Sequence, residues 1–521
     1  MDLKNFKLKK KSIIELLVLF VLGCLTSVSL PPVNLFIINF FTFSILFSFL
    51  FKKLDIQKNK ITYFLYGWLF GFGYFLSNLY WITISLTFDA NFSFLIPLAL
   101  IFIPSFLGIF YGLITLLFKL INPKNILSAF FIFSLLFGFI EYIRGIALTG
   151  FPWNLIVFSF SENLNFLNIL SLIGTYSLNL IVISFFILPS IFILRKTKRE
   201  IFVCIVFILI PVLFFSYSNF QKIKFNSKDF VQIPYTLRIL GTNISLDRFY
   251  DNSQTEKVIS ELILISSPDK SKKILFLWPE GIIPNIYRDD MILYKEIFNK
   301  SFNQDHLIGL GITHREAENQ DYKYYNSFSI FNNDLDLINN YNKNNLVPFG
   351  EFLPFKNLLN KIGLKTITNN FGSFNRGLNR KIIEIKNNNK VMNFLPLICY
   401  EIIYSGNLTK NYDFDFILNI SEDGWFGKSV GPKQHFAHSI FRAIETGKYL
   451  VRSSNNGITA IINPLGQIEK KIDYGETGFI DLEFIKKNEK TFFSTYGNKI
   501  FILLILIYIF MYFSFNRPNY E

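Results

Sequence analysis

Long runs of apolar residues alternate with short polar segments over the first 217 residues, and one further apolar run lies near the C-terminus. A helix that crosses a bilayer needs about 20 consecutive apolar residues, which is the length of most of these runs. The first run continues into a second one without a small-residue cleavage site, so no cleaved signal peptide is expected. The pattern predicts eight membrane-spanning helices, at 12–30, 33–51, 61–85, 93–118, 126–143, 165–194, 201–217 and 499–515.

Between residues 218 and 496 the pattern changes to short apolar runs separated by polar segments. Ile274–Trp278 is a continuous apolar run that ends at Pro279, as expected for a strand buried on both faces. Strands alternating with helices over this length favour an α/β sandwich domain. Further strands are predicted at 325–331, 393–398, 414–420 and 457–463, and helices at 254–266 and 432–448.

The chain carries a formal net charge of +14, which on its own suggests nucleic-acid binding. Its basic residues, however, gather in the N-terminal tail and in alternate loops between the predicted spans, whereas loops 86–92 and 144–164 hold only Arg144. Basic loops of membrane proteins lie in the cytoplasm, so the charge is a topology signal and no nucleic-acid partner is expected. The residues concerned are Lys4, Lys7, Lys9, Lys10, Lys11, Lys52, Lys53, Lys58, Lys60, Lys119, Lys124, Arg195, Lys196, Lys198 and Arg199.

This topology divides the chain into three parts. Seven spans that start from a cytoplasmic N-terminus bring the chain out on the far side of the membrane. We therefore predict a membrane domain at 1–217, an extracytoplasmic α/β domain at 218–496, and a last span with a cytoplasmic tail at 497–521.

Only one of the three cysteines lies in the predicted extracytoplasmic domain. Cys24 and Cys204 fall inside predicted spans, so Cys399 has no expected disulfide partner. A free cysteine is often only a small apolar core residue. Cys399 nevertheless follows a predicted strand in the polar segment Leu-Ile-Cys-Tyr-Glu (397–401), which leaves a nucleophile as the alternative.

Two other segments place ionisable side chains next to predicted strand ends. Trp-Pro-Glu-Gly (278–281) puts Glu280 directly after a buried strand, and the Pro- and Gly-containing loop at 341–351 carries Lys343 and Glu351. Taken singly, each is as well explained by a helix cap or a solvated surface residue.

Together, these side chains form a chemically coherent set. A thiol is a poor nucleophile at neutral pH unless a base takes its proton or a cation stabilises the thiolate. A buried Glu280 can be that base, and Lys343 can stabilise the thiolate and then an oxyanion. The set therefore favours acyl transfer through Cys399.

Three motifs occur in the order and spacing of a known family: Trp-Pro-Glu (278–280), Lys-x-x-Leu-Val-Pro-Phe-Gly-Glu (343–351) and Ile-Cys-Tyr-Glu (398–401). The chain resembles the carbon–nitrogen hydrolase (nitrilase) superfamily and, within it, the apolipoprotein N-acyltransferases, which are integral membrane proteins. The resemblance extends over nearly the whole chain, with further matching segments at 71–76, 141–145, 150–153, 419–426, 434–436 and 442–447.

The resemblance implies a nitrilase-like αββα sandwich as the catalytic domain. It makes Glu280 the general base, Lys343 the stabiliser of the thiolate and oxyanion, and Cys399 the nucleophile. Accessory residues of the family match Glu351, Tyr400 and Glu401.

Trp425 and Phe426 match a mobile substrate loop of the family, although a core position explains these two residues equally well. The chain departs from the family pattern at Asn345, where histidine is usual. It departs again near the first strand of the domain, where Phe249 is the nearest candidate for a tryptophan.

The reaction implied by the resemblance takes place at the inner membrane of a bacterium, with the catalytic domain in the periplasm. The acyl chain at the sn-1 position of a phospholipid, phosphatidylethanolamine, passes through a thioester on Cys399. It ends on the N-terminal amino group of the diacylglyceryl-cysteine of an apolipoprotein, which is the last step of lipoprotein maturation. No cofactor is implied, and we expect a monomer.

Three alternatives were weighed against this interpretation. His435 and His438 lie three residues apart on a predicted helix, a spacing that suits a metal ion, but no third ligand is evident and no metal is expected. A membrane-tethered amidase or nitrilase would use the same residues and pass the acyl group to water. A transporter or structural membrane protein would have lost the catalytic residues, which are all present.

Overall fold

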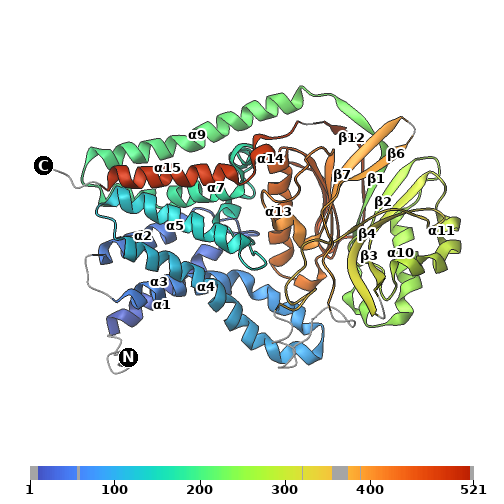
Figure 1. Cartoon of the computed structure of the whole chain (residues 1–521), viewed down its shortest axis with the longest axis horizontal. Coiled ribbons are helices and arrows are strands. Elements are labelled where there is room, and N and C mark those ends of the chain that lie inside the picture. The colour runs from blue at the N-terminus through green and yellow to red at the C-terminus, as the bar shows by residue number, and fades with distance from the viewer. Residues whose placement is uncertain are drawn as a thin grey trace. The chain divides into compact units, whose positions relative to one another are not determined.

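A computed structural model describes residues 10–54, 59–318, 321–354, 373–387, 389–487 and 489–516 (Figure 1). The chain forms two compact units. The helical unit comprises the described residues up to Thr83, Ser93–Asn219 and those from Tyr496 onward, and the α/β unit comprises Ile84–Phe92 and Phe220–Thr495.

Each of the eight predicted apolar runs contains a helix of the structure. Within the described part of the chain, five helical stretches are long and apolar enough to cross a membrane, namely 60–87, 90–121, 126–146, 170–194 and 198–226, and two shorter apolar helices cover 13–27 and 499–515. The count of eight spans stays a prediction, and Lys4, Lys7, Lys9 and Lys58 lie outside the described residues. The helices are α1 (Lys10–Ser27), α2 (Ile38–Lys53), α3 (Lys60–Leu79), α4 (Ile96–Ile121), α5 (Ile126–Ile146), α6 (Leu164–Leu167), α7 (Leu170–Phe186), α8 (Leu188–Leu194), α9 (Lys198–Asn226) and α15 (Lys499–Phe515).

The helical unit buries one ion pair on α5. Arg144 Nη2 lies 3.1 Å from Glu141 Oε1, and both side chains are almost fully buried. Arg144 Nη1 also donates to the carbonyl oxygen of Phe151 at 2.5 Å, so the pair ties the helix to the loop that follows it. Because an unpaired charge at this depth is costly, the two residues stabilise each other.

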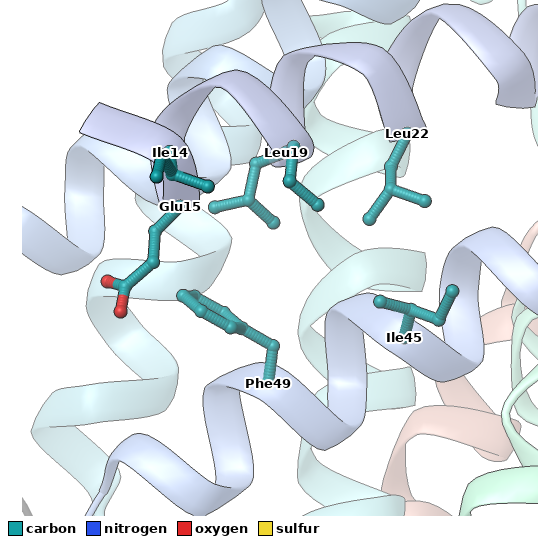
Figure 2. Close-up of a pocket in the computed structure, with 7 residues that line it drawn as sticks. Ile14, Glu15, Leu19, Leu22, Ile45 and Phe49 are labelled. Carbon is teal, nitrogen blue, oxygen red and sulfur yellow. The ribbon is translucent and has the colours of Figure 1, made fainter. Parts of the chain in front are cut away.

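A pocket of about 480 Å³ lies between α1 and α2 of the helical unit (Figure 2). Its lining is apolar except for Glu15, whose carboxylate binds Lys53 Nζ at 2.5 Å and accepts a hydrogen bond from the Tyr66 hydroxyl at 2.9 Å. The sequence-predicted site residues do not line it. The lining residues are Ile14, Glu15, Val18, Leu19, Leu22, Ile45 and Phe49.

The α/β unit is built on one sheet with the strand order β5-β4-β3-β2-β1-β9-β8-β7-β6. Its strands are β1 (Phe230–Thr242), β2 (Ile274–Leu277), β3 (His306–Glu318), β4 (Asp321–Asn332), β5 (Leu337–Asn342), β6 (Ile383–Asn387), β7 (Lys390–Ile398), β8 (Phe416–Glu422), β9 (Tyr449–Asn455), β10 (Thr459–Ile462), β11 (Ile468–Ile472) and β12 (Gly478–Lys486). Its helices are α10 (Thr255–Ser266), α11 (Lys295–Ser301), α13 (Gly431–Thr446) and α14 (Phe492–Tyr496).

The sheet consists of two halves that face each other. In the strand pairing of the described residues, β1 runs parallel to β9 and joins the halves through Gly241 with Ser454 and Thr242 with Asn455. The core between the halves includes Phe328 of β4 and Phe394 of β7, whose ring centroids are 6.3 Å apart.

Helices cover both outer faces of these halves. Alternate residues of β2 divide between two cores, because Leu275 and Leu277 face the other half and Ile274 and Phe276 pack against α10 and α11. The helix α13 lies on the outer face of the second half, next to β9 (Figure 1). The predicted αββα sandwich is confirmed, and Ile274–Trp278 is a strand buried on both faces because helices and a second sheet layer cover it.

Candidate active site

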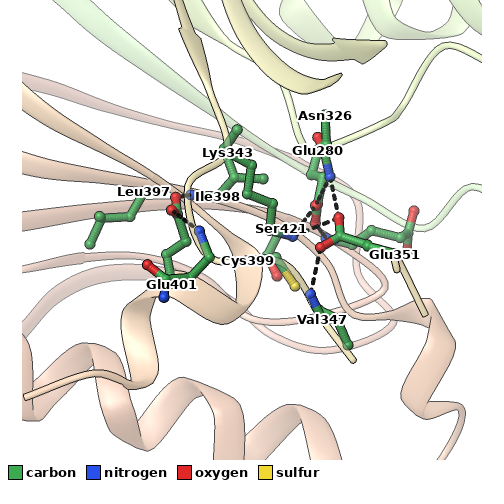
Figure 3. Close-up of polar contacts among 12 residues, drawn as sticks. Glu280, Asn326, Lys343, Val347, Glu351, Leu397, Ile398, Cys399, Glu401 and Ser421 are labelled. Atoms are coloured by element: carbon green, nitrogen blue, oxygen red, sulfur yellow. Dashed lines mark hydrogen bonds and ion pairs between the residues drawn. The ribbon is translucent and has the colours of Figure 1, made fainter. Parts of the chain in front are cut away.

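The three predicted catalytic residues stand at the carboxyl ends of strands. Glu280 follows β2, Lys343 follows β5 and Cys399 follows β7 directly. Strands β1, β2 and β3 are mutually parallel, as are β7, β8 and β9, so their carboxyl ends gather at one edge of each half. Figure 3 shows the side chains converging there, with Asn326 of β4 and Ser421 of β8 beside them.

Lys343 lies between two carboxylates. Its Nζ is 3.0 Å from Glu280 Oε1 and 2.9 Å from Glu351 Oε1, and the lysine side chain is only 1% exposed. Asn326 Nδ2 donates to the same two oxygens at 2.7 Å each. Two carboxylates thus share one ammonium group, so the cluster has a net charge of −1 when all three side chains are ionised.

This arrangement shifts the pKa values of its members. Burial alone lowers the pKa of Lys343, but the carboxylates of Glu280 and Glu351 raise it above the ordinary value. Burial raises the pKa of Glu351, and Lys343 counteracts part of that rise. The lysine therefore stays charged, while Glu351 retains a proton more readily than a carboxyl group in water.

The second oxygen of each carboxylate is held by the backbone. Glu280 Oε2 accepts a hydrogen bond from the N–H of Glu422 at 3.0 Å, and Glu351 Oε2 accepts one from Val347 at 2.8 Å. Gly311 permits the first arrangement, because a Cβ there would lie 2.4 Å from the Cα of Glu280. Both carboxylates are consequently fixed in position before any substrate binds.

Cys399 adopts a backbone conformation that few residues other than glycine take. Its φ is +48°, in the left-handed region, where a side chain is strained by about 1–3 kcal/mol. Burial and the nearby Glu280 raise the pKa of the thiol well above its usual value, whereas Lys343 and a hydrogen bond with Ser421 act to lower it. At rest the residue is therefore a neutral thiol, and it needs a base to become a nucleophile.

The carboxylate of Glu401 bridges the loop that carries Lys343 and the turn that begins at Cys399. Its fully buried Oε1 accepts hydrogen bonds from the N–H groups of Asn344 at 2.9 Å and Asn345 at 3.0 Å, while Oε2 accepts one from Ile398 at 2.9 Å. The Tyr341 hydroxyl, on β5, donates to the same carboxylate at 2.8 Å. The carboxylate of Glu401 thus connects the residues flanking Lys343 with the residue before Cys399.

The remaining predicted residues lie around this centre. Tyr400 is buried, and its ring contacts that of Tyr404 edge-on at 5.7 Å. Asn345, the departure from the family pattern, accepts a hydrogen bond from Arg380 Nη2 at 2.7 Å through its side-chain oxygen.

The predicted substrate loop is half-buried. The Trp425 ring stacks on Phe249 at 5.9 Å and meets Phe88 edge-on at 5.6 Å, while Phe426 meets His435 edge-on at 5.6 Å. Trp425 and Phe426 are therefore neither core residues nor fully exposed ones.

Asn326 is a site residue that the sequence analysis missed. The sequence of segment 325–331 predicts only a strand, and nothing in it distinguishes Asn326 as a site residue. Its position becomes informative only through pairing, because the backbone N–H of Lys343 donates to the carbonyl oxygen of Asn326 at 2.8 Å. That pairing brings its amide to both carboxylates.

The group of possible metal ligands that the structure brings together includes His435 but not His438. Among the described residues, Cys399, Asp423 and His435 bring potential ligand atoms within 4.8 Å of one another. Arg452 already places a positive charge there, with its Nη2 2.8 Å from Asp423 Oδ2. Because the guanidinium neutralises the carboxylate, the donor set does not fit a cation.

Comparison with known proteins places these features in two families. Residues 22–188 match the N-terminal domain of apolipoprotein N-acyltransferases, and residues 236–484 match the carbon–nitrogen hydrolases. The chain is 30% identical over 505 residues to the apolipoprotein N-acyltransferase of Rhizobium etli, covering 93% of both proteins. It is 31% identical over 490 residues to that of Rhodopseudomonas palustris, covering 91% of this chain and 89% of the relative.

Among solved structures, one match is an amidase from Nesterenkonia sp. AN1 that carries acrylamide added to its active-site cysteine. It is 10% identical, with a TM-score of 0.33, and the match covers 52% of this chain and 99% of the amidase.

Proposed function

The chain belongs to the apolipoprotein N-acyltransferase family, and we propose that it transfers an acyl chain from a phospholipid to the N-terminal amino group of apolipoproteins. The observation that carries the proposal is the buried Cys399 thiol at the edge of a cluster in which two carboxylates share one lysine. Such a cluster supplies a base and a fixed positive charge, which are the two things that a neutral thiol needs.

In the first half-reaction, Glu280 takes the proton of Cys399. The thiolate attacks the ester carbonyl carbon of the phospholipid, and the ammonium group of Lys343 stabilises the oxyanion that forms. The intermediate then collapses, the C–O bond breaks, and Glu280 returns the proton to the departing lysophospholipid. The acyl chain remains on Cys399 as a thioester, and no cofactor is needed to carry it.

In the second half-reaction, the α-amino group of a diacylglyceryl-cysteine attacks the thioester. Glu280 accepts a proton from the amine, Lys343 again stabilises the oxyanion, and the C–S bond breaks as the amide forms. The thiol is regenerated. Glu351 serves this cycle by fixing the position of Lys343, and Glu401 by fixing its loop.

The membrane helices and the family support a proposal for the location and the substrates. We propose that the protein lies in the inner membrane of a bacterium as a monomer, with the α/β unit in the periplasm, as the basic cytoplasmic loops predict. The donor is phosphatidylethanolamine, cleaved at its sn-1 ester, and the acceptor is a diacylated apolipoprotein. Trp425 and Phe426 would contact these lipid substrates, because they are large apolar side chains left partly exposed.

The proposal is tested with phosphatidylethanolamine that is labelled in its sn-1 acyl chain and supplied without acceptor. We expect a hydroxylamine-sensitive label on Cys399 of the purified protein and none on Cys399→Ala. Absence of label on the unmodified protein would refute the mechanism.

Adding a diacylated lipopeptide then separates transfer from hydrolysis. Label should move to the amino group of the lipopeptide. Label released mainly as free fatty acid would instead support a membrane-tethered hydrolase.

A further inference from the structure

A second buried polar group lies next to Cys399, and the proposed reaction does not use it. We call it the α13 network, made of Asp423, His435 and Arg452. His435 Nδ1 is 2.9 Å from Asp423 Oδ1, and Arg452 Nη2 is 2.8 Å from Asp423 Oδ2 and 3.1 Å from His435 Nδ1. All three side chains are 0% exposed.

Three elements of the second sheet half bring these residues together. Asp423 follows β8, Arg452 lies on β9, and His435 lies on the first turns of α13, which packs against β9. In the register of β8 and β9, Asn419 is the direct partner of Arg452 and also accepts a hydrogen bond from its guanidinium. Gly457 leaves room for the network, because a Cβ there would lie 2.3 Å from Asp423 Oδ2.

The α13 network reaches the nucleophile at two points. His435 Nε2 is 3.3 Å from the carbonyl oxygen of Cys399. On the side-chain face, Ser421 Oγ donates to Asp423 Oδ1 at 2.7 Å and also hydrogen-bonds the thiol of Cys399. The main chain and the side chain of the nucleophile are thus both connected to Asp423.

The proton arrangement on the ring follows from these contacts. A carbonyl oxygen only accepts, so the contact with Cys399 requires a proton on Nε2. Nδ1 faces both Arg452, which donates, and Asp423, which favours a proton at that nitrogen too. Burial, together with Arg452, holds the pKa of His435 below its usual value, although Asp423 acts in the opposite direction. With Nε2 protonated, the ring donates to the Cys399 carbonyl, and Nδ1 lies between the Arg452 guanidinium and the Asp423 carboxylate.

Stability alone does not account for these residues. Burying charged groups costs several kcal/mol per ion before their attraction is counted, and apolar residues of similar volume often serve a core as well or better. Other buried residues of α13 and β9 are apolar, including Phe441, Ile444 and Leu450, so both elements also carry apolar core side chains. The presence of the charged α13 network among such apolar side chains is consistent with a role in holding the neighbouring Cys399.

We propose that His435 is a positioning residue for the acyl transfer: by donating to the Cys399 carbonyl it holds the nucleophile in its left-handed conformation. The inference rests on the proposed function. At φ +48° the backbone of Cys399 is strained and would relax if nothing held it. Relaxation would rotate the planar peptide of Cys399 and Tyr400 and turn the sulfur away from Glu280 and Lys343.

Four single substitutions test the role. His435→Leu removes the hydrogen bond and keeps an apolar filling, whereas His435→Gln retains an N–H donor at similar reach. His435→Asn keeps the same amide on a shorter side chain that does not reach the carbonyl. His438→Leu is the matched control, because it removes an equally buried imidazole from the same helix, three residues further along.

Two rates are measured on the full-length protein in detergent. One is the alkylation of Cys399 by iodoacetamide, followed by peptide mass spectrometry, which needs no lipid. The other is single-turnover formation of the Cys399 thioester from labelled phospholipid. Thermal unfolding of each variant shows which proteins are folded.

We expect His435→Leu and His435→Asn to lower the thioester rate by about 100-fold, because misplacing a reacting group by about 1 Å costs that much. The KM for phospholipid should stay within about threefold, alkylation should also slow, and His435→Gln should recover most of both rates. His438→Leu should leave both rates within about threefold of the unmodified protein.

Equal losses in His435→Leu and His438→Leu would overturn the proposal, and so would a His435→Asn that is as active as His435→Gln. If His435→Leu does not fold, the Asn and Gln pair decides alone, since the two differ by one methylene. A protein that forms no thioester at all would refute the proposed function, while the alkylation rates would still decide the role of His435.

Discussion

Each unit of the molecule buries a cluster of charges, and the two clusters differ in composition. In the helical unit, Glu141 and Arg144 form a pair with one charge of each sign, and the residues are one turn apart on the same helix. In the α/β unit, the carboxylates of Glu280 and Glu351 both contact Lys343. Glu280 follows β2, whereas Lys343 and Glu351 lie on the loop that follows β5.

The difference separates a structural cluster from a reactive one. In a pair with one charge of each sign, protonating the carboxylate or deprotonating the cation is unfavourable, because either change leaves the other group as an unpaired buried charge. Two carboxylates around one ammonium carry one negative charge in excess, so a proton can be accommodated there at little cost. Excess charge, rather than burial alone, distinguishes a site that can move a proton.

The largest effect is expected from Cys399→Ala, which leaves both clusters intact and removes the group on which the reactive one acts. Acyl transfer should fall by about 10⁴-fold or more, the scale on which enzymes lose a nucleophile. Transfer of labelled acyl chain to a diacylated lipopeptide measures it. If Cys399→Ala transferred acyl chains at a rate within tenfold of the unmodified protein, the cluster of Glu280, Lys343 and Glu351 would have to activate a different nucleophile.

Substitutions that change the charge balance should come next. Glu280→Gln removes the base and should slow thioester formation by about 10²–10⁴-fold. Lys343→Met removes the stabilising cation and should cost about 10²–10³-fold. Single-turnover assays with labelled phospholipid measure both. A Glu280→Gln variant as fast as the unmodified protein would assign the base to a different residue.

The same variants should move the titration of the thiol in opposite directions. Glu280 raises the pKa of Cys399 and Lys343 lowers it. The rate of iodoacetamide alkylation should therefore rise at lower pH in Glu280→Gln and at higher pH in Lys343→Met than in the unmodified protein. Shifts of the same sign in both variants would contradict the arrangement of charges described above.

The smallest effect on the reaction is expected in the helical unit. Glu141→Gln leaves Arg144 without its charge partner and should lower the free energy of unfolding by about 3–5 kcal/mol, as for other buried pairs. The thioester rate of the folded fraction should stay within about threefold. Thermal unfolding and single-turnover assays on the same sample measure the two quantities, and a rate loss larger than the loss of folded protein would give the pair a part in catalysis.

Much of the fold could be predicted from local pattern. Ile274–Trp278 is apolar without interruption because both faces of its strand are covered, and this environment leaves a direct mark on the sequence. The motifs around Glu280, Lys343 and Cys399 were likewise evident, because each carries its functional residue within a few positions of a strand end.

The supporting residues could not be predicted in this way. Asn326 matters because β4 pairs with the residue after β5, and His435 because α13 crosses the end of β7, where Cys399 lies. Neither relation leaves a signal near the residue itself. The spacing of His435 and His438 would suit a metal ion, although none was expected, and it gave no indication that His435 contacts Asp423, Arg452 and a backbone carbonyl.

The division of the site residues between the two sheet halves has a consequence for when activity can arise during folding. Glu280, Lys343 and Glu351 belong to the half that contains β2 and β5, whereas Cys399 belongs to the half that contains β7. A chain in which the halves have not yet closed holds a thiol without its base and a base without its thiol. Under the proposed reaction, such a chain would not form the thioester, and acyl transfer would begin only once the two halves have closed.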